Sequence, residues 1–436
     1  MGRARGALQA NDFRLKSNFG VGVDWPIGYA DLEPWYTIAE DEIGVGGDDA
    51  FDWGSPRKAG YPMPKVPMSW ADQVVGQAAA ALGYTMAPFP QARNTIWRDG
   101  RPQCCGNASC VPICPIQAKY DATVHLGKAE SVGARLESQA VVSRIVIGAD
   151  RKVTSVRFLR PDKSEGEATA KIFVIAAHAI ETPKLLLMSS GEATPKGVAN
   201  SSDQVGRNLM SQIDIGIQGL TRDPVYTYRG PVSTGGLLEL RDGPFRGDHC
   251  AAGISPSNEG WQRAIGPMTV AVQYIKQGLR GDTLKQAIHD NVSRQLLIGT
   301  SGEMLPDDYN RVALAADQKD ALGIPRPAIW FRYQDYTMRG LDLARKIQTD
   351  IMTKLGATEV SQLGPIADSA IMGGTTRMGD DPKTSVVDAD LRAHDHANLF
   401  IAGSQVFPSI TANAPTLTVA ALSARLGATL LTELGG

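Results

Sequence analysis

The chain has 436 residues, of which 43% are hydrophobic and 21% charged, and its formal net charge is -2. This balance is typical of a soluble globular protein and excludes a disordered tail. The chain contains no run of about 18 apolar residues, the length that a membrane span needs. The first twelve residues lack the apolar core of a secretory signal. The near-neutral charge, without a Lys/Arg run, gives no footprint for nucleic acid. The length suits two or three domains around a small-molecule site.

Three helices and a small sheet are predicted in the first half of the chain. The helices cover about 29–42, 69–82 and 123–134, and Ser69 is a plausible N-cap for the second. Apolar runs follow at 140–147, 153–159 and 172–177, separated by turn-rich segments at 148–152 and 161–166. We therefore interpret residues 140–177 as a small β meander.

Two segments have the pattern of a parallel sheet. The run at 172–177 is a short apolar strand that leads into a helix at 181–188, and the strand at 398–404 closes on Gly403 before a helix from Pro415 to residue 434. Near-continuous apolar strands that run into helices are typical of parallel sheets covered on both faces. Residues 218–365 between these units alternate polar and apolar stretches with frequent Gly and Pro, which favours an inserted antiparallel sheet domain. We predict a mixed α/β fold.

Four of the five cysteines fall in one window, CCGNASCVPICP at 104–115, and only Cys250 stands apart. Disulfide frameworks spread their bridges to close loops, so this crowding argues against one. Several thiolates in one loop can converge on iron or zinc, and the C-x3-C-P ending is typical of ferredoxin-type cluster loops. The paired C-x2-C spacing of zinc sites is missing. Local disulfides or inert thiols are the alternative interpretation.

From about residue 11 onward, the chain resembles the glucose-methanol-choline (GMC) oxidoreductases. The cysteine loop contributes to this likeness, and so do the segments WPI (25–27), DLEP (31–34), IETPKLLL (180–187), VGRNLM (205–210), GTTRMG (374–379), SVVD (385–388), NLFIAGS (398–404) and NAPTLT (413–418). Within the family, the chain is most similar to the flavoprotein subunits of bacterial FAD-dependent glucose, gluconate and similar polyol dehydrogenases.

The resemblance implies a GMC-type, Rossmann-like FAD-binding domain without its N-terminal βαβ unit, and an inserted antiparallel-sheet substrate domain. It divides the chain into a partial substrate or lid region with the cysteine loop (1–119), an FAD-domain segment with the meander (120–217), a substrate-binding domain (218–372) and a C-terminal FAD-domain segment (373–436).

The resemblance also implies an FAD-dependent enzyme that acts on CH–OH groups of a sugar, polyol or related alcohol. In that family the carbinol gives hydride to the flavin while a side chain takes the hydroxyl proton. Asn413 is then catalytic through substrate positioning, and the implied cofactor-binding residues are Ala140, Val141, Ala177, Gly403, Ser404, Asn413, Ala414 and Thr416. Asn413 also precedes Pro415 at a helix start, where free N–H groups stabilise negative charge. Without the resemblance, Asn413 would be a cap or turn residue.

For the cysteine window the resemblance implies a three-iron (3Fe-4S) cluster. Three of Cys104, Cys105, Cys110 and Cys114 would hold it, and we expect Cys105 to be the spare thiol. Electrons would then pass to a protein acceptor, with a cytochrome c subunit and a small chaperone-like subunit as partners. Membrane contact would come only through such partners, on the periplasmic side of the inner membrane. A cytoplasmic location is the alternative.

Three positions depart from the family pattern. We find no strand–GxGxxG–helix unit for the FAD pyrophosphate, and we expect the nearest candidates, at 20–25 and 44–49, to be loops. Ile371 stands where most relatives have a His, and a general base contributes about 10²–10⁴ in rate. Ser369 and Asp368 lie nearby as substitutes without support from the family. Ser211 and Gln212 replace the usual Asp-His pair.

Two hypotheses follow. The first is a flavin-dependent alcohol or sugar dehydrogenase with an iron–sulfur relay, described by a chain short of its amino-terminal FAD unit. The second is a truncated or divergent GMC-like protein without catalysis that acts as an iron–sulfur or partner-binding subunit. Retention of Asn413, Gly403 and the cysteine loop favours the first, and loss of the fingerprint and of the His favours the second.

Overall fold

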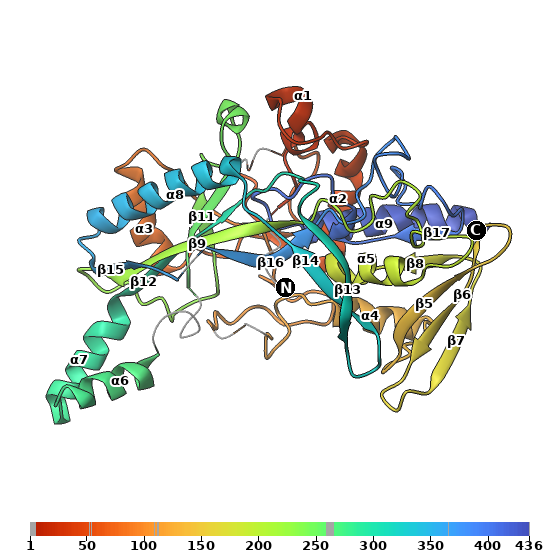
Figure 1. Ribbon diagram of the computed structural model, residues 1–436. Helices are drawn as coiled ribbons and strands as arrows, with labels where there is room; N and C mark the ends of the chain where they lie inside the picture. Colours follow the sequence, from red (N-terminus) through yellow and green to blue (C-terminus); the bar gives the residue numbers. More distant parts are fainter. Residues whose placement is uncertain are drawn as a thin grey trace.

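The computed structural model describes residues 6–435 apart from 52, 54, 109, 111, 112, 259–265 and 365. Figure 1 shows an elongated molecule with a large antiparallel sheet toward one end and a smaller helix-covered parallel strand pair toward the other. The described chain begins near the middle of the molecule and ends, after α9, at the end opposite the large sheet.

The large sheet has the order β11-β12-β9-β15, and β16 also pairs with β9, with every pair antiparallel. Its strands are β9 (Met210–Leu220), β11 (Ala252–Pro256), β12 (Gln295–Gly302), β15 (Thr358–Gln362) and β16 (Ala367–Gly373). Helix α8 (Asp335–Lys354) covers one face, because its apolar residues recur at helical spacing and pack on the apolar side of β9 and β12. The predicted antiparallel sheet is present, but it extends beyond 218–365, because β9 begins at Met210 and β16 covers Ala367–Gly373.

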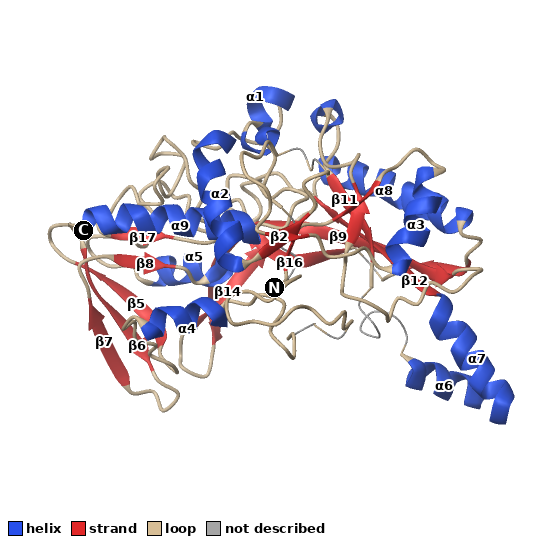
Figure 2. Ribbon diagram, turned by 180° about the vertical axis from the view of Figure 1, so that it is seen from behind, coloured by secondary structure: helices blue, strands red, loops and turns tan. Residues whose placement is uncertain are grey.

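The parallel pair consists of β8 (Phe173–Ile175) and β17 (Leu399–Ile401), as the apolar runs predicted. Helix α5 (His178–Met188) follows β8, and α9 (Thr416–Glu433) lies beside α2 (Tyr29–Ile43). Helix α9 buries a stripe that includes Leu417, Ala421 and Leu422, and a hydrogen bond of 2.9 Å joins Tyr36 Oη to Thr418 Oγ1 across the helix pair. Figure 2 shows this layer from behind.

The β meander differs from the prediction in its third strand. It consists of β5 (Val141–Ile147), β6 (Val153–Leu159) and β7 (Glu165–Thr169), in that order. Strand β7 covers the end of the segment predicted as a turn, 161–166, and the three residues after it, whereas the run at 172–177 supplies only β8, outside the meander. Strand β7 is a mostly exposed edge strand, so it carries no apolar alternation to read.

The remaining elements are short or peripheral. They are η1 (Ala10–Phe13), α1 (Leu15–Phe19), β1 (Val45–Gly47), β2 (Met63–Pro64), α3 (Trp70–Ala80), β3 (Met86–Pro88), β4 (Gln91–Ala92), α4 (Thr123–Ser131), β10 (Gly235–Leu237), η2 (Pro244–Gly247), α6 (Pro267–Lys276), α7 (Gly281–Arg294), β13 (Arg311–Lys319), β14 (Pro325–Trp330) and η3 (Ser404–Val406). Figure 1 shows the hairpin of α6 and α7 projecting from the large-sheet end.

Details of three predictions can be compared with these bounds. Helix α3 begins after Ser69, which accepts a hydrogen bond from Asp72 N and so is the expected N-cap. Residues 45–47 form strand β1, so the loop expected at 44–49 is only partly correct. The predicted domain boundaries at 217/218 and 372/373 fall inside β9 and β16. Within the described ranges, no helix is long and apolar enough to cross a membrane.

Candidate functional site

The loop between η3 and α9 carries Asn413 into the interior, where it is 5% exposed. Arg241 Nη2 donates to Asn413 Oδ1, and Asn413 Nδ2 donates to the Ala7 carbonyl at 3.1 Å. A guanidinium only donates and a carbonyl only accepts, so these two partners define which end of the amide is oxygen. The side chain of Asn413 therefore has one orientation.

Gln212 on β9 holds the backbone of the same loop. Its Nε2 donates to the carbonyls of Thr411 at 2.7 Å and Asn413 at 2.8 Å, although these residues lie 199 and 201 positions further along the chain. Sequence analysis noted Gln212 only as a departure from the family pattern. Gln212 is 2% exposed, and a buried polar side chain in a strand usually has a hydrogen-bond partner. This signal can be used only when the burial of the residue is known.

Ile371 lies on β16 in an irregular stretch beside β9. The two strands pair at Asp368–Ile213 and again at Met372–Ser211, with a register shift between them, so Ile371 lies along the strand segment that includes Gln212. Its hydrocarbon side chain can neither take nor give a proton. Ser369 Oγ is buried without a hydrogen-bond partner among the described residues, and the side chain of Asp368 lies outside the description.

The carboxyl ends of β8 and β17 bring Ala177 and Gly403 to one edge of the parallel pair. Ala402 N donates to the Ile175 carbonyl at 3.0 Å just before these residues. Gly403 has φ of +123°, and a Cβ there would lie 2.4 Å from Gln405 Oε1, so this position requires glycine. In parallel sheets, ligands bind at such carboxyl ends.

The other predicted cofactor residues fall into two groups. Ser404 follows Gly403, and Ala414 and Thr416 flank the start of α9, whose N-cap makes no side-chain hydrogen bond. The N–H groups of that helix start are therefore available beside Asn413. Ala140 and Val141 lie at the start of β5, where Val141 is 45% exposed, and no hydrogen bond in the described structure joins them to Asn413.

The residues near Gly403 and Asn413 fit the flavin end of FAD, the cofactor that the motifs imply. Gln405 Oε1 and Thr376 Oγ1 are buried polar atoms that lack a partner within the described part of the chain. Buried polar groups usually have partners, so such atoms suit a polar ligand edge. The uncapped start of α9 adds donors for the electron-rich side of a reduced ring.

A cavity of about 440 Å³ is connected to Asn413 through one of its lining residues, Ala7. Ala7, Trp53, Arg57 and Tyr61 are among its lining residues, and the Ala7 carbonyl is the one that accepts from Asn413. Arg57 forms a two-pronged ion pair with Glu40, with both N···O distances 2.6 Å. Burial raises the pKa of Tyr61 to about 12, so its phenol stays protonated at neutral pH. The volume is within the range of small-molecule sites.

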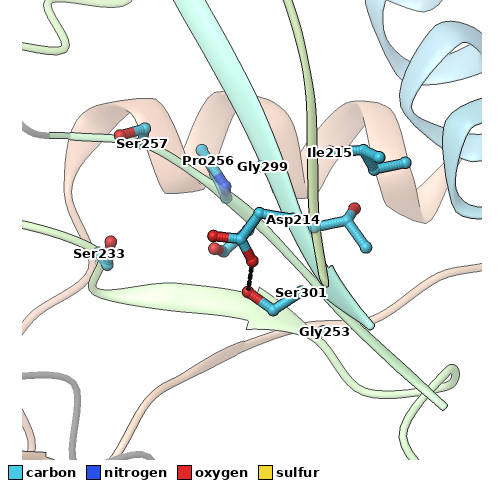
Figure 3. Close-up of a pocket in the computed structure, with 10 residues that line it drawn as sticks. Asp214, Ile215, Ser233, Gly253, Pro256, Ser257, Gly299 and Ser301 are labelled. Atoms are coloured by element: carbon cyan, nitrogen blue, oxygen red, sulfur yellow. Dashed lines mark hydrogen bonds between the residues drawn. The ribbon is translucent and has the colours of Figure 1, made fainter. Parts of the chain in front are cut away.

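A second, much smaller cavity of about 20 Å³ lies on the large sheet, with room for about one water. Figure 3 shows Asp214 facing Ser301, whose Oγ donates to Asp214 Oδ1 at 2.7 Å. Serines from β11 and β12 and glycines that leave space complete the lining. Because side chains alternate along a strand, Asp214 faces away from Ile215 and Ile217, which pack toward α8.

The four clustered cysteines are all free thiols. Cys110 is buried and Cys105 is exposed, while Cys104 and Cys114 are intermediate. Burial raises the pKa of Cys104, with Arg93, Cys105 and Cys110 as its charged or ionisable neighbours. Among the residues that the structure describes, which omit 109, 111 and 112, no group of three His, Cys, Asp or Glu side chains is placed to hold a metal. The predicted gathering of three thiolates is therefore not shown.

Buried cations surround this cysteine window. Arg93 Nη2 donates to Cys110 Sγ at 3.5 Å, and Lys119 Nζ donates to the Cys110 carbonyl at 2.6 Å. Arg93, Arg101 and Lys119 are 2%, 4% and 4% exposed, and none forms an ion pair with a described carboxylate. Arg93 Nη1 and Arg101 Nε and Nη1 have no hydrogen-bond partner in the described structure. Arg93 and Lys119 therefore bring positive charge to the buried Cys110.

Known proteins resemble the chain over most of its length. Residues 27–214 and 306–423 match two family models, both described as GMC oxidoreductase. The chain is 39% identical to the fructose dehydrogenase large subunit of Gluconobacter japonicus, over 97% of this chain and 77% of that protein. It is 30% identical to paromamine 6'-oxidase of Streptomyces fradiae, over 93% of this chain and 72% of that protein. Among solved structures, pyridoxine 4-oxidase from Mesorbium loti shares the fold, with a TM-score of 0.64 and 20% identity over 98% of this chain and 81% of that one.

Proposed function

The chain belongs to the GMC oxidoreductase family, and from that premise we propose that it oxidises a CH–OH group of a sugar, polyol or related alcohol with FAD as the hydride acceptor. The observation that carries this proposal is the fixed amide of Asn413 between a buried guanidinium and the wall of the 440 Å³ cavity. The names of two relatives, a fructose dehydrogenase large subunit and a paromamine 6'-oxidase, support a sugar-like substrate class.

In this proposal FAD supplies the hydride-accepting centre when it is bound. Gly403, Ser404, Ala414 and Thr416 hold its flavin end, together with the free N–H groups at the start of α9. Asn413 Nδ2 has two N–H bonds, and only one is used by the Ala7 carbonyl. The second donates to the oxygen of the reacting hydroxyl and orients its carbon toward the acceptor. Ile371, on β16 beside the strand segment of Gln212, takes no proton.

The test is reduction of added FAD by alcohols in the purified chain. We expect an aldose, ketose or polyol to bleach the flavin absorbance, and Asn413→Ala to slow the bleaching about 10²-fold, the effect of removing one well-placed donor. Asn18→Ala, at an exposed position, is the matched control and should leave the rate unchanged. If FAD binds but no aldose, ketose or polyol reduces it, this proposal is wrong. The non-catalytic alternative then replaces it, which the hydrocarbon side chain of Ile371 favours.

We further propose that the cysteine window holds an iron–sulfur cluster that passes electrons to a protein acceptor. Three buried cations without carboxylate partners among the described residues suit an anionic, thiolate-ligated group. The relative named as a large subunit supports assembly with further subunits, and we propose a cytochrome c subunit and a small subunit as the partners. The described thiols are not gathered around one point, so no electron-transfer geometry is derived.

Iron and acid-labile sulfide analysis, with electron paramagnetic resonance, tests the cluster. We expect about three irons per chain and a signal that is lost in Cys110→Ser and in Cys114→Ser. Cys105→Ser is the matched control, because Cys105 is the exposed thiol that we expect to be spare. A chain that contains no iron after anaerobic purification would contradict the proposal.

A further inference from the structure

We propose that Arg241 is a positioning residue for the oxidation site, where it locks the amide of Asn413 and holds a permanent positive charge beside the reacting oxygen. This inference rests on the proposed function, since it concerns the same site. It assigns a role to a residue that no sequence motif singled out.

The first observation is a buried charge without a counter-charge. Arg241 is 7% exposed, and it forms no ion pair with any carboxylate in the described ranges. Asp12 and Asp242, the carboxylates that favour the charged form of Arg241, are engaged by Arg246 at 2.9 and 3.1 Å. Burial lowers the pKa of Arg241 to about 10, so the side chain still carries its charge at neutral pH. A buried, unpaired cation is costly to keep and is more often found at functional sites than in a structural core.

The second observation is the placement of the guanidinium. It lies over the ring of Trp53, with its central carbon 4.6 Å from the ring centroid. Trp53 is itself fixed, because Gln9 Nε2 donates to its carbonyl at 2.7 Å and its own Nε1 donates to the Pro88 carbonyl at 3.1 Å. Trp53 lines the cavity, so Arg241 is held between a rigid cavity wall and Asn413.

The third observation is that the oxygen and the nitrogen of the Asn413 amide have different partners. Arg241 occupies Oδ1, so that atom is not available to accept from a substrate hydroxyl. Nδ2 donates to the carbonyl of Ala7, a residue that lines the cavity, and its second N–H remains for the substrate oxygen. A donor and a nearby cation both stabilise alkoxide character on the substrate oxygen. This is the assistance that a site with a hydrocarbon residue at position 371 needs most.

The charged and titratable groups that face Arg241 are few. Asp12 on η1, Tyr61 in the cavity wall and Asp242 favour its charged form, and Arg246 opposes it. The first three come from separate segments, so substitution of Arg241 alone changes the charge at Asn413 without removing these neighbours.

The experiment compares Arg241→Met and Arg241→Lys in the full chain loaded with FAD. We expect Arg241→Met to lower kcat by about 10²-fold with KM changed less than about threefold, because transition-state stabilisation is lost rather than uniform binding. In the pH profile of kcat/KM, the rise of Arg241→Met should lie about one pH unit above that of the wild type. The reason is that a nearby positive charge lowers the pKa of the substrate hydroxyl, and this variant lacks that charge. Arg241→Lys keeps the charge, so it should retain the wild-type pH profile with a smaller loss in kcat. Arg229→Met removes an exposed arginine that stacks on Tyr226 in the same manner, at 4.1 Å, and should change nothing.

Crystal structures of the wild type and of Arg241→Lys provide a readout that does not depend on turnover. We expect the amide of Asn413 to rotate or split into two orientations in Arg241→Lys, because an ammonium cannot reproduce the reach of a guanidinium fork. An unchanged amide together with an unchanged kcat and pH profile in both variants overturns the inference. A wild-type chain that binds FAD and oxidises no alcohol overturns the proposed function instead, and the amide orientation then still decides whether Arg241 positions Asn413.

Discussion

Asp72 shows how one buried carboxylate joins two distant segments. Its Oδ2 accepts from Ser69 N at 3.0 Å and from Ser69 Oγ at 2.7 Å at the start of α3, and also from Thr234 Oγ1 before β10. Ser69 was predictable as a cap from local sequence, whereas Thr234 was not. Arg241 and Gln212 escaped prediction for the same reason, because their partners lie more than 170 residues away.

Asp72 should also make stability depend on pH. Burial raises its pKa above the ordinary 3.8, so the folded chain holds this proton more strongly than the unfolded chain does. The resulting stabilisation is fully present below pH 3.8 and is lost as the pH rises through the folded-state pKa. We expect the free energy of unfolding of the wild type to fall relative to that of Asp72→Asn as the pH rises from about 4. Urea unfolding between pH 4 and 7 measures this, with the exposed Asp282→Asn as control, and parallel pH curves for wild type and Asp72→Asn would contradict it.

At the scale of elements, sequence patterns located the helices and apolar strands better than the polar ones. Helices α2, α3 and α9 begin and end within a few residues of their predicted limits, because caps and apolar spacing are local signals. Strand β7 was missed because its stability comes from pairing with β6. The polar residues of β7 form no local pattern that predicts this pairing. Gly403 could be placed just after β17 by motif, but its positive φ of +123° is visible only in the structure.

Helix α9 contains an exposed glycine whose replacement should stabilise the fold. Gly427 has no atom within 4 Å of the place where a Cβ would stand. Alanine favours helix over glycine, so Gly427→Ala should raise the free energy of unfolding by about 0.5–1 kcal/mol, visible as a higher denaturant midpoint.

Gly374→Ala provides the opposite case. Gly374 has φ of +90°, and its added Cβ would lie 2.2 Å from the Asn208 carbonyl. This variant should be clearly destabilised, and an equal response of the two glycines would contradict the argument.

At the scale of the whole molecule, one buried ionic cluster joins segments that are far apart in sequence. Arg246 on η2 is fully buried and pairs with Asp12, Asp242 and Glu303. Tyr336 on α8 donates to Glu303 Oε1 at 2.6 Å and so connects the cluster to the helix that covers the large sheet. None of these pairings was visible in the sequence, because buried charges look like surface charges until the fold brings them together.

Removal of the central cation should be severe. Arg246→Met leaves two fully buried carboxylates without their partner, which typically costs about 3–5 kcal/mol of stability. Equilibrium unfolding in urea measures the loss. Arg339→Met, at an exposed position that contacts Asp248, is the control and should change stability by less than about 0.5 kcal/mol. A loss of similar size in both variants would show that the cluster contributes no more than a surface pair.

The projecting hairpin of α6 and α7 lies between the two halves of the large sheet in sequence but outside it in space. A cut at its tip, near Gly278, leaves every strand intact and distributes them alternately, since β11 and β9 fall on one fragment and β12 and β15 on the other. Strand β12 pairs with β9 over its whole length, from Gln295 to Gly302. The strands of the two fragments would therefore alternate in one sheet, so each fragment needs the other to complete its hydrogen bonds. The tip is thus a natural place to split the chain for complementation, far along the chain from Asn413.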